Sequence, residues 1–208
     1  MDNIKFEITD DQPPGSIPRL PLPKIVLVGH SRHGKDTVAE ILSTFYGMSF
    51  KSSSEFLAER LCFNALKDKY GYKDSKECFD DRHNHRKEWY DLIANYCADD
   101  PTRLGKEIFK ESDIYCGLRN KREFTWMRNT GIFDLSIWVD RSRHLPPEDK
   151  ESNDIEPWMA DFIIDNNGSR DDLVIGTRAL MDRLIGPEHM MEMQGNPDAD
   201  LIKLDFNL

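Results

Sequence analysis

The sequence lacks several features that mark whole classes of protein. It has no apolar run near the roughly 20 residues that a membrane-spanning helix needs, and its first residues have neither the basic start nor the apolar core of a signal peptide. No two cysteines form a C-x-x-C pair, which favours buried, reduced thiols at Cys62, Cys78, Cys97 and Cys116. We therefore expect a cytoplasmic protein with no membrane partner.

Positive charge is also scarce. Lys and Arg number 28 against 38 Asp and Glu, which gives a formal net charge of −10 over 208 residues. Such a surface repels the phosphate backbone of nucleic acids, so we do not expect stable nucleic-acid binding. Basic residues that bind an anion must therefore act in local clusters. Three clusters are present: Arg32-His33-Gly34-Lys35, Arg119–Arg122 together with Arg128, and Arg141–Arg143.

The most informative motif is a candidate phosphate-binding loop. Gly29 and Gly34 bracket four residues and Lys35 follows, which fits the pattern G-x-x-x-x-G-K. The eighth position carries Asp36, and the hydroxyl comes one place later at Thr37. The two glycines allow positive φ and a close approach of the backbone to a phosphate, and Lys35 adds a positive charge for the β- and γ-phosphates. The motif predicts a bound nucleotide.

The residues around this loop provide the structural context that the motif requires. The stretch 25–28 is β-branched and apolar throughout, which is typical of a central strand in a parallel sheet. Apolar residues follow the loop at helical spacing, at Val38, Ile41, Leu42 and Phe45. The N-terminus of this helix would direct free N–H groups and the positive end of its dipole toward the same phosphate.

Strands and helices alternate along the rest of the chain. Further strands are predicted at 48–51, 113–116, 132–139 and 160–164. Ser54 is expected to cap a helix, and the spacing of Ser169 and Asp172 indicates a capping box at the start of the last helix. This order predicts an α/β fold: a P-loop NTPase three-layer α/β/α sandwich with a mainly parallel sheet and ligands at the carboxyl ends of its strands.

The domain organisation follows from composition. Residues 1–23 are polar and rich in proline, which predicts an extended arm before the domain at 24–185. Residues 186–208 have no steady period and are expected to form a C-terminal tail.

A GTPase would carry two further motifs, and the chain has only approximations to them. Asn120-Lys-Arg-Glu123 resembles the guanine-selecting N-K-x-D but ends in Glu, and no apolar strand precedes it directly. Asp68-Lys-Tyr-Gly71 matches D-x-x-G, yet the residues before it have a helical pattern. We interpret both matches as accidental.

The chain as a whole resembles the P-loop nucleoside monophosphate kinases. The resemblance rests on Gly34-Lys-Asp-Thr37, on arginines after the strands at 113–116 and 132–139, and on the ending Ala160-Asp-Phe-Ile-Ile-Asp-Asn-Asn-Gly-Ser169. It is closer to the deoxynucleoside monophosphate kinases of tailed bacteriophages, which also use G-K-D-T. Dephospho-coenzyme A kinase, with a similar ending, is more distant. The resemblance spans about residues 24–184, but residues 51–103 match no known pattern.

The resemblance implies an enzyme that uses ATP and Mg²⁺, located in the host cytoplasm if a phage encodes it. The ATP phosphates would be bound by Gly29, Ser31, Arg32, His33, Gly34, Lys35, Asp36 and Thr37. Thr37 and Asp36 would orient the metal ion or its water. Asp36 has an equally good structural explanation, as an acidic residue in the first turn of a helix.

The remaining site residues follow from the same resemblance. Lys35, Arg119, Arg141 and Arg143 would be catalytic, the last two in a lid at about 141–157 that closes over the transferred group. The acceptor would bind in a helical region at about 50–105, to Ser54, Arg86 and Arg119, with Arg82 a weaker candidate.

Several alternatives stay open at this point. The acceptor could be another small molecule or a modified base in DNA, and a regulatory protein could keep the nucleotide-binding loop without catalysis. The accepted base and sugar, and whether the chain forms a homodimer, are also open.

Overall fold

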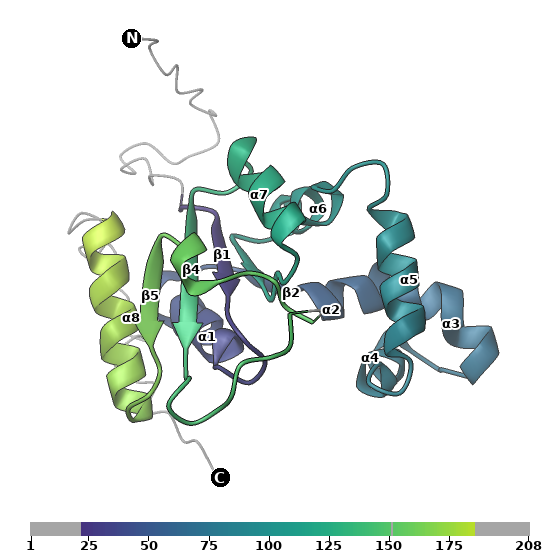
Figure 1. Ribbon diagram of the computed structural model, residues 1–208, viewed down its shortest axis with the longest axis horizontal. Coiled ribbons are helices and arrows are strands. Elements are labelled where there is room, and N and C mark those ends of the chain that lie inside the picture. The colour runs from purple at the N-terminus through teal and green to yellow at the C-terminus, as the bar shows by residue number, and fades with distance from the viewer. Residues whose placement is uncertain (1–21, 151, 186–208) are drawn as a thin grey trace, which may run out of the picture.

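The computed structural model describes residues 22–150 and 152–185. The predicted tail and all but the last two residues of the predicted arm lie outside these ranges. Figure 1 shows a central sheet with helices on both sides and a further group of helices beyond β2. The elements are β1 (Ile25–Val28), α1 (Lys35–Tyr46), β2 (Phe50–Ser52), α2 (Ser53–Leu57), the π-helical segment η1 (Ala58–Cys62), α3 (Phe63–Tyr70), α4 (Ser75–Asp81), α5 (Arg86–Tyr96), α6 (Arg103–Glu111), β3 (Ile114–Cys116), α7 (Lys121–Asn129), β4 (Leu135–Asp140), the 3₁₀ turn η2 (Pro157–Met159), β5 (Phe162–Asp165) and α8 (Arg170–Ile185).

The strands form one sheet in the order β2-β3-β1-β4-β5, and every neighbouring pair is parallel. Ile25 of β1 lies opposite both Ile114 of β3 and Leu135 of β4. All carboxyl ends therefore lie at one edge of the sheet, where the loops after β1, β3 and β4 meet. The predicted three-layer α/β/α fold with a mainly parallel sheet is confirmed.

Each face of the sheet supports its own hydrophobic core, because successive strand residues point to opposite sides. Ile25 and Leu27 pack on the side of α1 and α8, whereas Val26 and Val28 pack on the other side. The first core includes Val38, Ile41, Leu42, Leu173 and Met181. The second includes Phe56, Leu66, Trp89, Ile108 and Phe124. Burial on both faces explains why the β1 sequence is apolar throughout.

The predicted strands are all present, with shifted boundaries. The strand predicted at 132–139 begins only at Leu135, because Gly131 (φ 65°) ends α7 and the Ile132 N–H donates to Met127 O at 3.0 Å. The strand predicted at 48–51 begins at Phe50. Ser49 is held there by the Asp113 side chain, whose Oδ2 accepts from the Ser49 backbone N at 2.9 Å. The last strand, predicted at 160–164, spans Phe162–Asp165.

One of the two predicted helix caps is correct. The Ser169 backbone N–H donates to Asp172 Oδ2 at 2.8 Å and the Asp172 N–H donates to Ser169 Oγ at 3.2 Å, which is a reciprocal capping box. The prediction for Ser54 is wrong. The helix already includes Ser53, its N-cap is Ser52, and no side chain caps it.

The two GTPase-like matches have structural explanations. Asn120 is the N-cap of α7, and its side chain accepts from the Glu123 N–H at 3.0 Å. Gly71 ends α3 in the left-handed conformation (φ 74°), so Asp68-Lys-Tyr-Gly71 is a helix C-terminus. One segment therefore begins a helix and the other ends one.

Candidate active site

The loop between β1 and α1 needs its two glycines. Gly29 has φ 139°, and a Cβ there would lie 2.6 Å from Val139 O of the neighbouring strand β4. Gly34 has φ 94°, and a Cβ there would lie 2.3 Å from Asn166 Nδ2. That same amide donates to His33 O at 2.9 Å, so the turn after β5 helps to support the loop. The loop fits between two strand ends because both positions lack a side chain.

Lys35 lies inside the loop that the motif predicts. Its side chain is 7% exposed, and its Nζ donates to Gly29 O at 3.0 Å and to His30 O at 2.7 Å. Burial lowers the pKa of Lys35, and the nearby positive charge of Arg119 lowers it further. A phosphate bound beside this ammonium group would offset both effects. The position therefore suits an anion.

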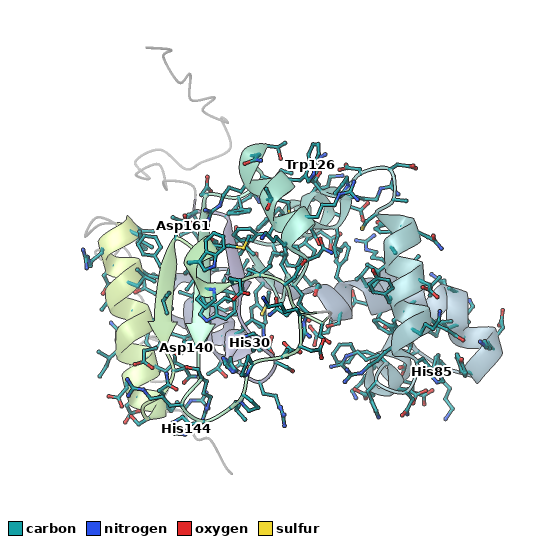
Figure 2. All side chains as sticks on the ribbon, viewed as in Figure 1. His30, His85, Trp126, Asp140, His144 and Asp161 are labelled. Atoms are coloured by element: carbon teal, nitrogen blue, oxygen red, sulfur yellow. The ribbon has the colours of Figure 1, made fainter. Side chains whose placement is uncertain are left out.

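Two histidines of the loop connect it to the segment after β4. The buried His33 ring accepts from the Arg141 N–H at 3.0 Å through Nδ1, and the His30 Nδ1 accepts from the Glu148 N–H at 3.2 Å. Burial is the main cause that lowers the pKa of both histidines. Both rings therefore act as neutral acceptors. Figure 2 shows His30 toward the end of the sheet where Asp140 lies, far from His85 in the outer helices.

The first turn of α1 provides oxygen atoms that suit Mg²⁺. Asp36 is exposed, and its Oδ1 accepts from the Cys116 Sγ at 3.1 Å. Burial raises the pKa of Cys116 and Asp36 raises it further, so Cys116 remains a thiol donor. In the described part of the chain, no three His, Cys, Asp or Glu side chains are grouped to hold a metal ion. A carboxylate and the Thr37 hydroxyl would still fit a Mg²⁺ ion held mainly by phosphates and water.

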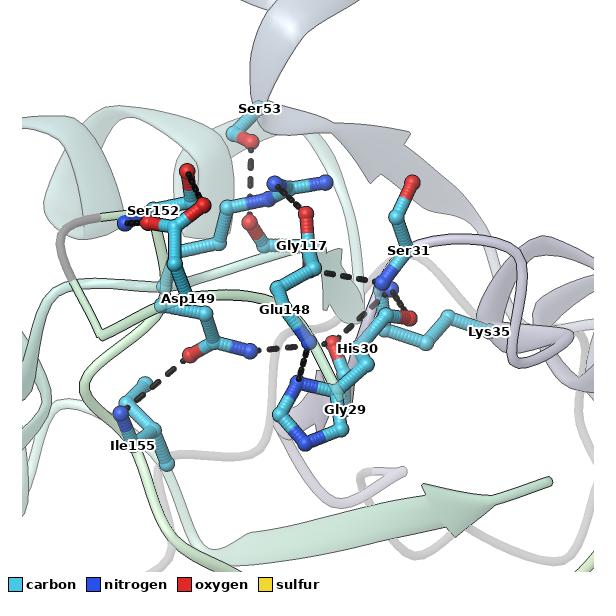
Figure 3. Close-up of polar contacts among 12 residues, drawn as sticks. Gly29, His30, Ser31, Lys35, Ser53, Gly117, Glu148, Asp149, Ser152 and Ile155 are labelled. Carbon is cyan, nitrogen blue, oxygen red and sulfur yellow. Dashed lines mark hydrogen bonds and ion pairs between the residues drawn. The ribbon is translucent and has the colours of Figure 1, made fainter. Parts of the chain in front are cut away.

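Arg119 lies at the mouth of the loop and is paired with an acidic residue that the sequence did not predict. Arg119 Nη1 donates to Glu148 Oε1 at 2.7 Å, and the other carboxylate oxygen, Oε2, accepts from the Ser31 N–H at 2.6 Å. Figure 3 shows Glu148 beside His30 and Ser31 of the loop. The predicted catalytic residues Lys35 and Arg119 thus share one neighbourhood with the predicted ATP-binding Ser31. No sequence signal beyond a polar, proline-containing stretch distinguishes Glu148.

The structure does not bring the other two predicted catalytic arginines onto Lys35. Among the described residues, neither guanidinium hydrogen-bonds to the loop. Arg141 contributes its backbone N–H to His33, and Arg143 donates its backbone N–H to Asn167 Oδ1 at 2.9 Å. The Arg143 side chain lines a cavity of about 440 Å³ between β5 and α8, which also has Asp165 in its wall.

Of the residues predicted for the acceptor, Ser54 and Arg119 follow the carboxyl ends of β2 and β3, and Arg86 is the first residue of α5. Ser54 follows β2 within α2, and its hydroxyl is 3.4 Å from that of Ser52. Burial lowers the pKa of Arg82, and the positive charges of Arg119 and Arg86 contribute to the shift. Arg82 is therefore close enough to each of the other two arginines to interact with it electrostatically. Arg82, the weaker candidate, stacks on the Phe79 ring with its guanidinium carbon 3.8 Å from the ring centroid.

In residues 22–150 and 152–185, no helix is long and apolar enough to cross a membrane. No protein-family model and no curated protein matches the chain.

Similar solved structures include two shikimate kinases. That of Bacteroides thetaiotaomicron is 12% identical with a TM-score of 0.42, over 77% of this chain and 97% of that one. That of Aquifex aeolicus is 17% identical with a TM-score of 0.42, over 78% of this chain and 98% of that one. Similarity at this level carries no argument about activity, so the function must be inferred from the residues of the site.

Proposed function

We propose that the chain is an ATP-dependent kinase that transfers the γ-phosphoryl group of ATP to a (deoxy)nucleoside monophosphate and yields the diphosphate. The observation that carries the proposal is the buried Lys35, the first residue of α1, directly after a glycine-bounded loop, with Arg119 from the segment after β3 acting on its charge. Phosphoryl transfer requires little covalent chemistry from the protein. It depends on positioning and on neutralising the charge of the transferred group.

The donor side of the site would bind the ATP phosphates. The backbone N–H groups from Ser31 to Thr37 and the positive end of the α1 dipole favour an anion at this position. Lys35 would neutralise charge on the β- and γ-phosphates. A bound Mg²⁺ would supply further charge neutralisation between those phosphates. In this proposal Thr37 and Asp36 orient the ion or its water shell.

The acceptor side would bind a second phosphate. Arg86 and Arg119 supply guanidinium groups, which grip phosphate oxygens in pairs, and Arg82 adds charge nearby. This local excess of positive charge in a chain of net charge −10 favours a small anionic acceptor over a long nucleic acid. A nucleoside monophosphate has the charge and size that such a site requires.

The direct test is an acceptor screen. ADP formation from Mg-ATP would be measured with each common ribo- and deoxynucleoside monophosphate, with hydroxymethylated deoxynucleotides, with phosphate-free nucleosides and with an oligonucleotide that carries the modified base. We expect turnover with one or a few monophosphates and none with the nucleosides. Turnover with only the oligonucleotide, or with no acceptor at all, would contradict the proposal.

Replacement of Lys35 by Ala tests whether the loop acts in catalysis. Loss of a preorganised charge at the transferred group should lower kcat by at least about 100-fold to 1000-fold. Lys87→Ala is the matched control, because Lys87 is exposed on α5 and forms an ion pair with Asp91 at 3.7 Å. A regulatory nucleotide-binding protein would instead show no acceptor-dependent turnover in either variant or in the parent.

A further inference from the structure

Glu148 occupies the place where the proposed function requires a phosphate. Its two carboxylate oxygens accept from the Ser31 N–H at 2.6 Å and from Arg119 Nη1 at 2.7 Å. The charge of Glu148 also acts on the Lys35 ammonium. A carboxylate and a phosphate oxygen present the same negative, hydrogen-bond-accepting surface to such donors. The Ser31 N–H, one of the donors assigned to the nucleotide phosphates, and the Arg119 guanidinium are therefore already engaged by an acid of the same chain.

The segment that carries Glu148 is fastened to the loop at further points. The Glu148 N–H donates to His30 Nδ1 at 3.2 Å, and Asn153 Nδ2 donates to Gly29 O at 3.3 Å. The Asp154 N–H donates to Arg119 O at 3.3 Å. Figure 3 shows Glu148 and Ile155 on the same side of the loop, and Ile155 is buried at 1% exposure. Glu148 is therefore held over the loop by a packed segment.

We propose that Glu148 is an internal competitor for the phosphate site, so that a nucleotide must displace its carboxylate before binding. The inference rests on the proposed function, because it takes the loop to be a phosphate site. Both partners of Glu148 lose a charge-assisted hydrogen bond when the carboxylate leaves, and phosphate oxygens replace those bonds. Displacement of Glu148 uses part of the free energy of nucleotide binding, so the observed affinity for the nucleotide is lower than it would be without Glu148.

The competitor has a functional consequence for a kinase. While Glu148 is engaged, Arg119 is paired, and Ser31 has no free N–H to offer a phosphate. Displacement by the nucleotide would release Arg119 for the transferred group and would move Glu148 together with Asn153 and Asp154, which fasten its segment to the loop and to Arg119. Nucleotide binding and completion of the site would therefore be coupled.

The test measures binding without the acceptor. Calorimetric titrations with Mg-bound, non-hydrolysable ATP analogue and with inorganic tripolyphosphate would compare the parent chain, Glu148→Gln and Glu156→Gln. Glu156 lies on the same segment and pairs with Lys150 at 3.6 Å, so it controls for loss of one negative charge. We expect both ligands to bind about tenfold more tightly to E148Q and with unchanged affinity to E156Q.

The outcomes separate this inference from the proposed function. If the ATP analogue and tripolyphosphate bind to E148Q with unchanged or lower affinity, the proposal that Glu148 competes with the nucleotide is wrong, even if the parent enzyme phosphorylates a monophosphate. A fall in kcat with unchanged binding would overturn it as well, and would make Glu148 a group that assists the acceptor. Tighter binding of both ligands to E148Q, with no turnover on any acceptor, would support competition by Glu148 and contradict the proposed kinase activity. If neither ligand binds to any variant, both fail.

Should E148Q fold poorly, hydrogen exchange in the parent chain gives a second measurement. Tripolyphosphate should speed exchange at the Asp154 N–H, which the closed segment protects through Arg119 O. Protection that rises uniformly across residues 148–155 on ligand addition would overturn the proposal.

Discussion

Single residues in this protein owe their chemistry to partners far away in the sequence. Glu123 is an example outside the candidate site. It lies in the first turn of α7, and its Oε1 accepts from the Tyr115 hydroxyl at 3.2 Å. Burial raises the pKa of Glu123 to about 8. An acid whose pKa is raised in the folded state binds its proton more tightly there than in the unfolded chain, so it links stability to pH.

Glu123 should make the protein less stable as pH rises. Its contribution is fully present below the ordinary pKa of 4.5 and is lost as pH rises toward about 8, where the buried carboxyl must ionise. Glu123→Gln should remove this dependence of the free energy of unfolding on pH. The difference in free energy of unfolding between the variant and the parent should therefore grow in favour of the variant from pH 5 to pH 8. Urea denaturation at several pH values measures it. The exposed Glu40→Gln on α1 is the control, and equal slopes in parent and E123Q would contradict the expectation.

At the scale of elements, the strand–loop–helix unit was predictable because its requirements are local. The apolar strand, the two glycines and the helical period all fall within residues 25–45. The capping box at Ser169 and Asp172 is local as well, since its partners are three residues apart. Strand boundaries were less predictable. The start of β4 depends on how α7 ends, and the start of β2 depends on Asp113, which directly precedes β3.

The close approach of the loop to β4 gives a prediction for this unit. Gly29→Ala would place a Cβ 2.6 Å from Val139 O, a backbone atom that cannot turn away. The cost should be about 3 kcal/mol of unfolding free energy. Gly47→Ala is the matched control: Gly47 also has positive φ, at 66°, but a Cβ there would meet nothing within 4 Å. It should cost only about 1 kcal/mol. Equal losses in denaturant titrations would show that the contact with β4 is unimportant.

At the scale of the whole molecule, basic side chains from distant parts of an acidic chain come close together, with acidic side chains among them. Arg119 follows β3, whereas Arg82 and Arg86 come from the outer helices, yet their charges interact. The charge of Arg119 also acts on Lys35 at the start of α1. The chain has a net charge of −10, so this local concentration should decide where small anions bind.

Removing one outer arginine should therefore affect the acceptor selectively. Arg86→Ala should raise the KM for the monophosphate about tenfold through loss of a charge-assisted contact. The KM for ATP should stay unchanged, because Arg86 belongs to α5 and not to the loop. Initial-rate measurements with each substrate varied in turn test this. Arg122→Ala, an exposed arginine on α7, is the control. Equal effects of R86A on both KM values would contradict a separate acceptor side.

The sequence by itself determined the fold class, the glycine-bounded loop between β1 and α1 and the last helix cap, because each depends on periodicity or on residues a few positions apart. Only the tertiary structure decided which side chains meet at the loop. Glu148 and Ser31 are 117 positions apart, and their contact exists because β1 and β4 are neighbours in the sheet. Arg143 follows β4 as the sequence predicts, and only the structure places it in the wall of a cavity beside β5 and α8. Local patterns carry no information on such pairings, which follow from the strand order.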